Sequence, residues 1–177
     1  KKNFLKGRFL GITEYLANKT NRTNKVAMLI YNKKLSVSPI TTHLPLKEVH
    51  KHLTKKKIIN HVKLIKKFYK KEFNKNPRIA ITGLNPHCES NYKSSEEDRI
   101  IKPAIKHLSK KKYIINGPFA ADTIFMKEQS RKYDVVIGMY HDQVLTPLKT
   151  LFGFNAINIT LGLPFIRISP DHGPNTF

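Results

Sequence analysis

The stretch that decides the fold class is DVVIGMYHDQVLTPLK, residues 134–149. Its first part is a β-branched, apolar run of the kind that is buried on both faces of a parallel sheet. The run then ends in four polar side chains, Tyr140, His141, Asp142 and Gln143. A buried strand with such an end is typical of an α/β protein whose functional site lies at the carboxyl edge of its sheet.

Strand patterns and helix patterns alternate through the rest of the chain. The further predicted strands are VAMLIY (26–31), LSVSPI (35–40), RIAITG (78–83), YIIN (113–116), AINITL (156–161) and FIRIS (165–169). A helix is predicted from Lys55 to Phe73, because apolar residues recur there at helical spacing with lysines between them. A second helix is expected to begin at the capping-box pattern Ser94-x-x-Glu97 and to restart at Pro103, and GPFAADTIFMKE is expected to lead into another. This alternation predicts a layered α/β fold with a parallel or mixed sheet and flanking helices.

The charge of the chain is unevenly spread. The 177 residues carry a net charge of +21, and residues 1–78 hold 21 Lys and Arg against 3 acids, whereas residues 79–177 hold 12 against 9. Nucleic-acid binding is one interpretation of this excess. However, 27 of the 33 cations are Lys, which favours a solvated basic face over a phosphate-clamping surface. We therefore expect no nucleic-acid partner.

Other global features are bland. No run of residues approaches the ~20 apolar positions of a membrane span, and no signal-peptide pattern is visible. The single cysteine, Cys88, is typical of a reducing compartment. These features favour a cytoplasmic protein without a membrane partner.

The eight histidines fall into two groups. His50, His52, His61 and His107 lie in Lys-rich helical segments and are predicted to be surface residues. His43, His87, His141 and His172 lie in loops after strands. Three imidazoles that converge can bind Zn²⁺ or another divalent metal, although spacings of 44 and 54 residues form no short metal motif and isolated loop histidines remain the alternative.

Three more polar residues could take part in a site: Lys149 follows His141 by eight residues, and Asn158 and Arg167 lie on or beside the late strands. Together they could hold a small anionic substrate by its phosphate and carboxylate, although each alone is more often a surface residue. None of the standard glycine-rich dinucleotide or phosphate fingerprints is present in the sequence.

Taken together, several motifs resemble the 4-hydroxythreonine-4-phosphate dehydrogenase family of pyridoxal phosphate biosynthesis. They are TTHLPL (41–46), ITGLNPH (81–87), EED (96–98), NGPFAADTIF (116–125), YDVVIGMYHDQVLTPLK (133–149) and INITLGLPFIRISPDHG (157–173). The resemblance implies an NAD- or NADP-dependent enzyme related to the isocitrate and isopropylmalate dehydrogenases, with two α/β domains and a homodimeric assembly. The implied reaction is metal-assisted oxidation, then decarboxylation, of 4-phosphooxy-L-threonine in vitamin B6 biosynthesis.

The resemblance also implies roles for residues that match the family's motifs. It implies a divalent metal, zinc or alternatively magnesium or cobalt, on His43, His87 and His141. It implies substrate contacts at Thr13, Lys149, Asn158 and Arg167, catalytic roles for Asp122 and Lys149, and cofactor contacts at Asp171, His172 and Gly173. Asp142 and Gln143 are expected to position these groups.

The sequence departs from the family pattern in three places. Ile12 stands where the family has a histidine that contacts substrate, and the loop 88–93 lacks the family's glycines. The segment after DHG also differs. We expect residues 1–177 to be the central-to-C-terminal portion of a two-domain dehydrogenase, incomplete at both ends, with a possible boundary near 76–78. The alternatives are a dehydrogenase of a related four-carbon sugar-acid phosphate, and an inactive remnant that still binds metal.

Overall fold

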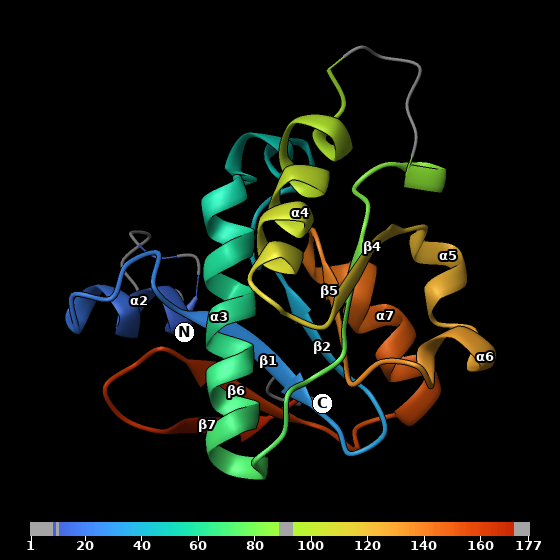
Figure 1. Cartoon of the computed structure of the whole chain (residues 1–177). Helices are drawn as coiled ribbons and strands as arrows, with labels where there is room; N and C mark the ends of the chain where they lie inside the picture. Colours follow the sequence, from blue (N-terminus) through green and yellow to red (C-terminus); the bar gives the residue numbers. More distant parts are fainter. Residues whose placement is uncertain (1–8, 10, 89–93, 172–177) are drawn as a thin grey trace.

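A single mixed sheet organises the chain in this computed structural model, which describes residues 9, 11–88 and 94–171. Its seven strands lie in the order β4-β3-β5-β2-β1-β6-β7 (Figure 1). Strands β4, β3, β5 and β2 are parallel to one another, whereas β1 is antiparallel to β2 and β6, and β7 is antiparallel to β6. The strands are β1 Ala27–Tyr31, β2 Ser36–Pro39, β3 Ile79–Thr82, β4 Ile115–Phe119, β5 Val135–Gly138, β6 Ile157–Leu161 and β7 Arg167–Pro170.

The helices, like the strands, follow the predicted alternation. The α-helices are α2 Ile12–Lys19, α3 Lys55–Phe73, α4 Lys102–Lys110, α5 Ala121–Ile124, α6 Lys127–Ser130 and α7 His141–Phe152. The short helical segments are η1 Leu46–Glu48, η2 His50–His52, η3 Pro86–Cys88 and the π-helical η4 Glu97–Ile101. In the described part of the chain, no helix is long and apolar enough to cross a membrane.

Both faces of the sheet are covered. Ile79, Ile81, Val135 and Ile137 pack in one core with α3 and α4, which lie side by side in Figure 1. The residues between them, such as Ala80 and Val136, pack on the other face with α7. Successive side chains of a strand point to opposite faces, so an unbroken apolar run is what a strand between two helical layers requires. The α/β class is therefore confirmed.

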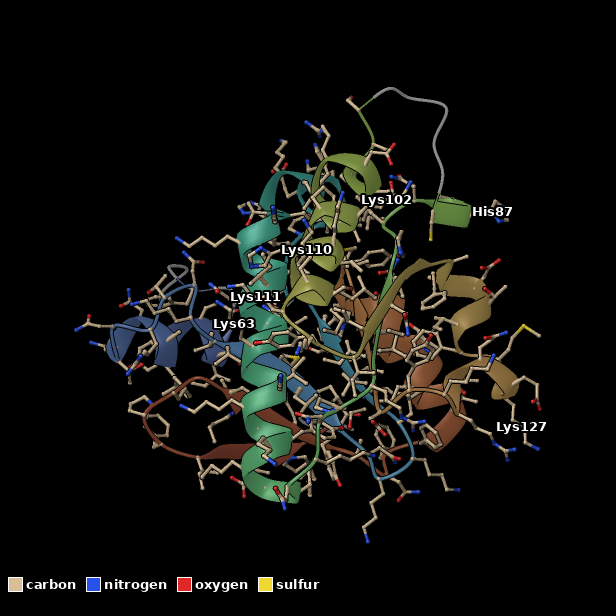
Figure 2. All side chains as sticks on the ribbon, in the orientation of Figure 1. Lys63, His87, Lys102, Lys110, Lys111 and Lys127 are labelled. Atoms are coloured by element: carbon tan, nitrogen blue, oxygen red, sulfur yellow. The ribbon has the colours of Figure 1, made fainter. Side chains whose placement is uncertain are left out.

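Helix α3 begins and ends at the predicted residues. The Thr54 hydroxyl accepts a hydrogen bond from the Lys57 N–H, and Asn74 ends the helix in the left-handed conformation. Lysines cover the exposed sides of α3 and α4, as Figure 2 shows for Lys63, Lys110 and Lys111.

The prediction that His61 is a surface residue is wrong. Its side chain is only 4% exposed, because position 61 falls on the same helical face as Ile58, Val62 and Ile65. Burial and the charge of Lys57 lower the pKa of His61 to about 4. The imidazole is therefore neutral inside the core.

The start of the second predicted helix is shifted by one residue. Ser95, not Ser94, accepts the capping hydrogen bond, from the Asp98 N–H at 3.2 Å. Glu97 is instead fully buried and turns toward the loop after β3. The helix then restarts with Pro103 in the first turn of α4, as predicted.

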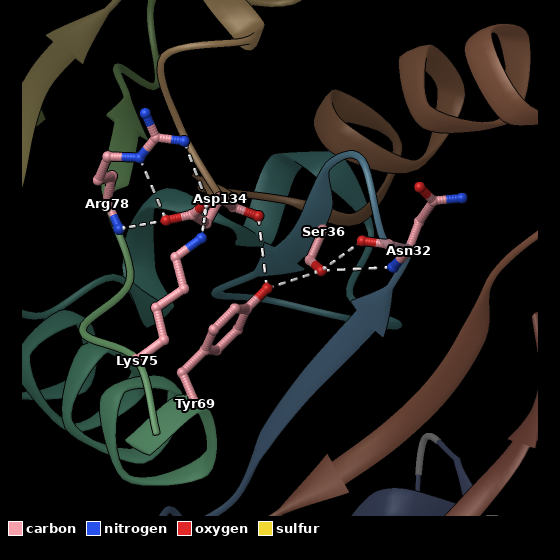
Figure 3. A network of polar contacts seen from close by, with 6 residues as sticks. All are labelled: Asn32, Ser36, Tyr69, Lys75, Arg78 and Asp134. Carbon is pink, nitrogen blue, oxygen red and sulfur yellow. Dashed lines mark hydrogen bonds and ion pairs between the residues drawn. The ribbon is translucent and has the colours of Figure 1, made fainter. Parts of the chain in front are cut away.

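A polar network fixes the edge of the sheet where β3 and β5 begin (Figure 3). Asp134 accepts hydrogen bonds from the Arg78 N–H at 2.8 Å and from Lys75 Nζ at 2.7 Å, and the Tyr69 hydroxyl contacts Ser36 Oγ at 2.9 Å. These residues join the end of α3 to the starts of three strands, at the edge of the sheet opposite the carboxyl ends. Strands on both sides of residues 76–78 belong to this one sheet, and the boundary expected there stays a prediction.

Candidate functional site

The carboxyl edge of the sheet gathers the polar residues expected from the sequence. His43 follows β2, His87 follows β3, Asp122 follows β4, and His141 directly follows β5. Since these four strands are parallel, their carboxyl ends lie at one edge. His43 and His141 come close enough there to share a ligand, with ring centroids 6.1 Å apart and planes inclined by 36°.

His43 is held from the side of α2. Its Nδ1 lies 3.7 Å from Oε2 of Glu14, and the other oxygen of that carboxylate accepts a hydrogen bond from the Thr42 hydroxyl at 2.7 Å. The adjacent carboxylate raises the pKa of His43. Burial alone would raise the pKa of Glu14, but the His43 imidazole and the Thr42 hydroxyl lower it to about 2. Glu14 is therefore a carboxylate that faces an imidazole.

His141 is the first residue of α7, and its Nδ1 lies 2.7 Å from Oδ1 of Asp142. Both close histidines thus have a carboxylate beside Nδ1, an arrangement that leaves Nε2 with its lone pair available. Carboxylates in this position are typical partners of metal-binding histidines. The donor chemistry of the pair fits a divalent metal.

Gln143 locks the two central strand ends together. Its Oε1 accepts hydrogen bonds from the Met139 N–H at 2.6 Å and the Thr82 hydroxyl at 2.9 Å, and its Nε2 donates to the Gly83 carbonyl at 2.8 Å. The side chain is buried, so it fixes the distance between the loop after β3 and the start of α7.

His87 does not join the other two histidines. It is exposed, its φ of +56° is in the left-handed region, and Figure 2 shows it at the outer edge of the molecule. Within residues 9, 11–88 and 94–171, no three His, Cys, Asp or Glu side chains form a group that could hold a metal ion. The role of His87 as a metal ligand stays a prediction.

The loop that carries His87 is nevertheless built around a buried acid. Glu97 Oε1 accepts hydrogen bonds from the N–H groups of Leu84 at 2.8 Å and Asn85 at 2.9 Å, and Oε2 accepts one from Asn85 Nδ2. Burial alone would raise the pKa of Glu97, but these hydrogen bonds lower it. A charged Glu97 therefore fixes the first part of the loop.

The expected anion-binding residues lie along α7, β6 and β7. Lys149 Nζ donates to the Asp171 carbonyl at 2.7 Å and lies 3.9 Å from Oδ2 of the same residue. Arg167 donates to the Thr160 hydroxyl at 3.3 Å, and Oδ1 of Asn158 is buried without a hydrogen bond from any described residue. The unfilled acceptor on Asn158 is a group that a polar ligand can use.

The remaining predicted site residues are more scattered. Asp122 is exposed in the short helix α5. Thr13 is buried and lines a cavity of about 190 Å³ together with Glu14 and Lys57. Asp171 is buried, whereas His172 and Gly173 lie outside the described residues. The cofactor role of this last segment stays a prediction.

Two residues of the site were not predicted as such. Glu14 directly follows Thr13 in the run Gly11-Ile12-Thr13-Glu14, and Glu97 stands in the EED motif (96–98), so both lie next to or within segments named by the resemblance. Only the fold shows that each carboxylate faces a neighbouring loop, since the sequence separations are 28 residues for Thr42 and 13 for Leu84.

Comparisons with known proteins agree with one another. The family model described as pyridoxal phosphate biosynthetic protein PdxA matches residues 2–176. A 4-hydroxythreonine-4-phosphate dehydrogenase of Sulfurihydrogenibium sp. is 47% identical over 167 residues, which are 93% of this chain and 51% of that relative. One from Aquifex aeolicus is 43% identical, over 92% of this chain and 50% of its own.

A solved structure is equally similar. The crystal structure of 4-hydroxythreonine-4-phosphate dehydrogenase from Klebsiella pneumoniae matches 98% of this chain with a TM-score of 0.82 at 40% identity, and 53% of that chain is covered. This chain therefore spans about half the length of the curated relatives it matches.

Proposed function

Because this chain belongs to the PdxA family of pyridoxal phosphate biosynthetic proteins, we propose that it is part of a nicotinamide-dependent, metal-assisted dehydrogenase. The proposed substrate is 4-phosphooxy-L-threonine, which is oxidised and then decarboxylated on the way to pyridoxal 5′-phosphate. The observation that carries the proposal is the His43–His141 pair, whose centroids lie 6.1 Å apart with a carboxylate beside each Nδ1.

We propose that one group of residues binds the metal and another binds the anionic groups of the substrate. His43 and His141 would hold a divalent metal through Nε2, zinc or alternatively magnesium or cobalt. When bound, the metal would lower the pKa of a coordinated substrate hydroxyl, and NAD or NADP would accept the hydride. Gln143 keeps the start of α7 in place against β3, so that His141 keeps its position.

The phosphate and carboxylate of the substrate require cationic partners. We propose that Lys149 and Arg167 supply them, with Asn158 as a hydrogen-bonding group between β6 and β7. Lys149 would also act in catalysis, with Asp122, and Thr13 would contact the substrate from α2. Asp171, His172 and Gly173 are proposed to contact the nicotinamide cofactor.

His87 requires a separate account, because within the described residues of one chain it forms no metal-binding group with the pair. Glu97 and Gln143 bind the first part of its loop, at residues 83–85, and this makes a large inward shift costly. We therefore propose that a homodimer forms and that His87 completes the metal site of the second copy. In this assembly the exposed His87 would face the His43–His141 pair of the other copy.

A second candidate substrate follows from Ile12. Ile12 opens α2 beside Thr13 and is 39% exposed, but its side chain cannot donate a hydrogen bond to a ligand. Loss of that contact favours a related substrate such as a four-carbon sugar-acid phosphate. A third possibility is that the chain only binds metal and has no turnover.

The test is NADH production by the purified protein with 4-phosphooxy-L-threonine and, separately, with 4-phosphoerythronate, in the presence of Zn²⁺, Mg²⁺ or Co²⁺. We expect turnover with the first substrate. His141→Ala should abolish it, and His52→Ala, which changes an exposed histidine of η2, should not. Turnover only with the second substrate would select the alternative. Metal binding with no turnover on either would contradict both dehydrogenase proposals.

A further inference from the structure

We propose that Glu14, Gly11 and Thr42 form a clamp that fixes the ring orientation and tautomer of His43. In this clamp Glu14 is a positioning residue that holds the Nδ1–H of His43, so that Nε2 presents its lone pair toward His141. The inference rests on the metal role proposed above for His43, and it assigns to Glu14 a function that its place in the sequence motif does not reveal.

The first observation is the unfilled oxygen of Glu14. Its Oε2 is buried, accepts no hydrogen bond from any described residue, and lies 3.7 Å from His43 Nδ1. A buried carboxylate oxygen without a donor is costly, because no hydrogen bond offsets its loss of hydration. A rotation of the imidazole that brings Nδ1–H onto this oxygen would satisfy it.

The second observation is that the carboxylate itself is fixed. Oε1 of Glu14 accepts a hydrogen bond of 2.7 Å from the hydroxyl of Thr42, the residue directly before His43. Glu14 also lies in the first turn of α2, so its backbone is held by the helix. The carboxylate is thus held by Thr42 and by its place on α2, and its second oxygen lies on the side of the imidazole.

The third observation is the close approach of Gly11. A Cβ at this position would lie 2.8 Å from both Cε1 and Nδ1 of His43, and 2.9 Å from Oε2 of Glu14. Its φ of −161° is open to any residue, so the backbone conformation does not require glycine. What requires glycine is the space occupied by the imidazole and the carboxylate, which both rest against the Gly11 backbone.

These three contacts distinguish His43 from His141. The carboxylate beside His141 belongs to Asp142, whose side chain is 80% exposed and therefore freely hydrated. The Glu14 side chain is only 30% exposed. The carboxylate beside His43 is therefore the less hydrated of the two.

The direct test is the tautomer of His43, read from the long-range ¹H–¹⁵N correlations of its ring in the metal-free protein at a pH where the imidazole is neutral. The proposal expects the Nδ1–H form in the wild type and a mixture in Glu14→Ala. Glu128→Ala, which removes an exposed carboxylate on α6, should leave the wild-type pattern. An Nε2–H form in the wild type would overturn the proposal and requires no variant to fold.

A second readout is the affinity for Co²⁺, followed by its visible absorption in the purified chain. Loss of a carboxylate that orients a ligand histidine typically weakens metal binding by about 10–100-fold. We expect that loss in Glu14→Ala, a smaller loss in Glu14→Gln, and a loss in Gly11→Ala, because the added methyl group displaces the ring. Unchanged affinity and tautomer in folded Glu14→Ala would overturn the clamp.

The two proposals fail in different ways. If the wild type binds no Co²⁺, the metal role of His43 is wrong in this chain, yet the tautomer measurement still decides whether Glu14 holds the ring. If Co²⁺ binds and His43→Ala abolishes binding while Glu14→Ala does not change it, the function stands and the clamp does not.

Discussion

Replacement of Gln143 by leucine tests how the two central strand ends are held together. The variant keeps a side chain of similar size but removes three hydrogen bonds, to the Met139 N–H, the Gly83 carbonyl and the Thr82 hydroxyl. Thr82 can turn its hydroxyl, but the two backbone groups stay in place. Each buried group left without a partner costs about 1–3 kcal/mol.

The apolar leucine offsets part of this cost by about 1 kcal/mol. We therefore expect Gln143→Leu to lower the free energy of unfolding by about 3 kcal/mol, a large part of the 5–15 kcal/mol typical of a domain. The assay is urea unfolding followed by far-UV circular dichroism and tyrosine fluorescence, since the chain has no tryptophan. Gln129→Leu on α6, where the glutamine is exposed, is the matched control and should change stability by at most about 0.5 kcal/mol. A loss under about 1 kcal/mol in Gln143→Leu would refute the reasoning.

Three further variants test other parts of the fold. In Asp134→Asn the charge-assisted bonds from Lys75 and Arg78 are lost, which should cost about 2 kcal/mol. In the wild type, burial alone would raise the pKa of Asp134, but these bonds lower it. The stability that Asp134 contributes should therefore be fully present above the ordinary Asp pKa and be lost as the pH falls through the lowered pKa. If the stability of the wild type and that of the variant depend on acid pH in the same way, this reasoning is contradicted. The pKa of His61 is about 4 in the folded chain against an ordinary 6.5. The free energy of unfolding should therefore be highest above pH 6.5 and fall by about 3 kcal/mol as the pH drops toward 4. His61→Phe should abolish this pH dependence. Gly83→Ala would place a methyl group 2.8 Å from Cys88 Sγ, so it should lower the melting temperature and increase alkylation of the Cys88 thiol; unchanged reactivity would show that the loop does not move.

Periodicity predicts the elements whose burial is regular. The apolar stripe of α3 fixed both ends of that helix, and the apolar runs of β3 and β5 showed that helices cover both faces of the sheet. The prediction for His61 failed because a histidine among lysines is usually exposed, whereas position 61 falls on the buried face of α3. The position on the helix decides burial, and the polar imidazole is tolerated as a neutral ring.

Boundaries that depend on local hydrogen bonds were less accessible from the sequence. The capping pattern fits Ser94 with Glu97 and Ser95 with Asp98 equally well, and only the burial of Glu97 selects the second. Strand β4 likewise runs over Ile115–Phe119 rather than 113–116. Its register is set by pairing with β3, which lies far away in the sequence.

The part of the candidate site that lies directly after the parallel strands was predictable from the sequence. A parallel sheet places the residues after β2 and β5 at one edge, and His43 and His141 do meet there. The sequence could not show that His87 points away, because that depends on how the loop after β3 folds over Glu97. Nor could it show the contact of Glu14 with His43, which joins α2 to the loop after β2.

The central claim is that His43 and His141 together form the core of a metal site. Calorimetric titration of the purified, metal-free chain with Zn²⁺ tests it most directly, with His43→Ala and His141→Ala as variants and His52→Ala as the control. We predict saturable binding in the wild type and the control, and at least about a tenfold loss of affinity in each of the two variants. Binding that is equally strong in all four proteins would contradict it.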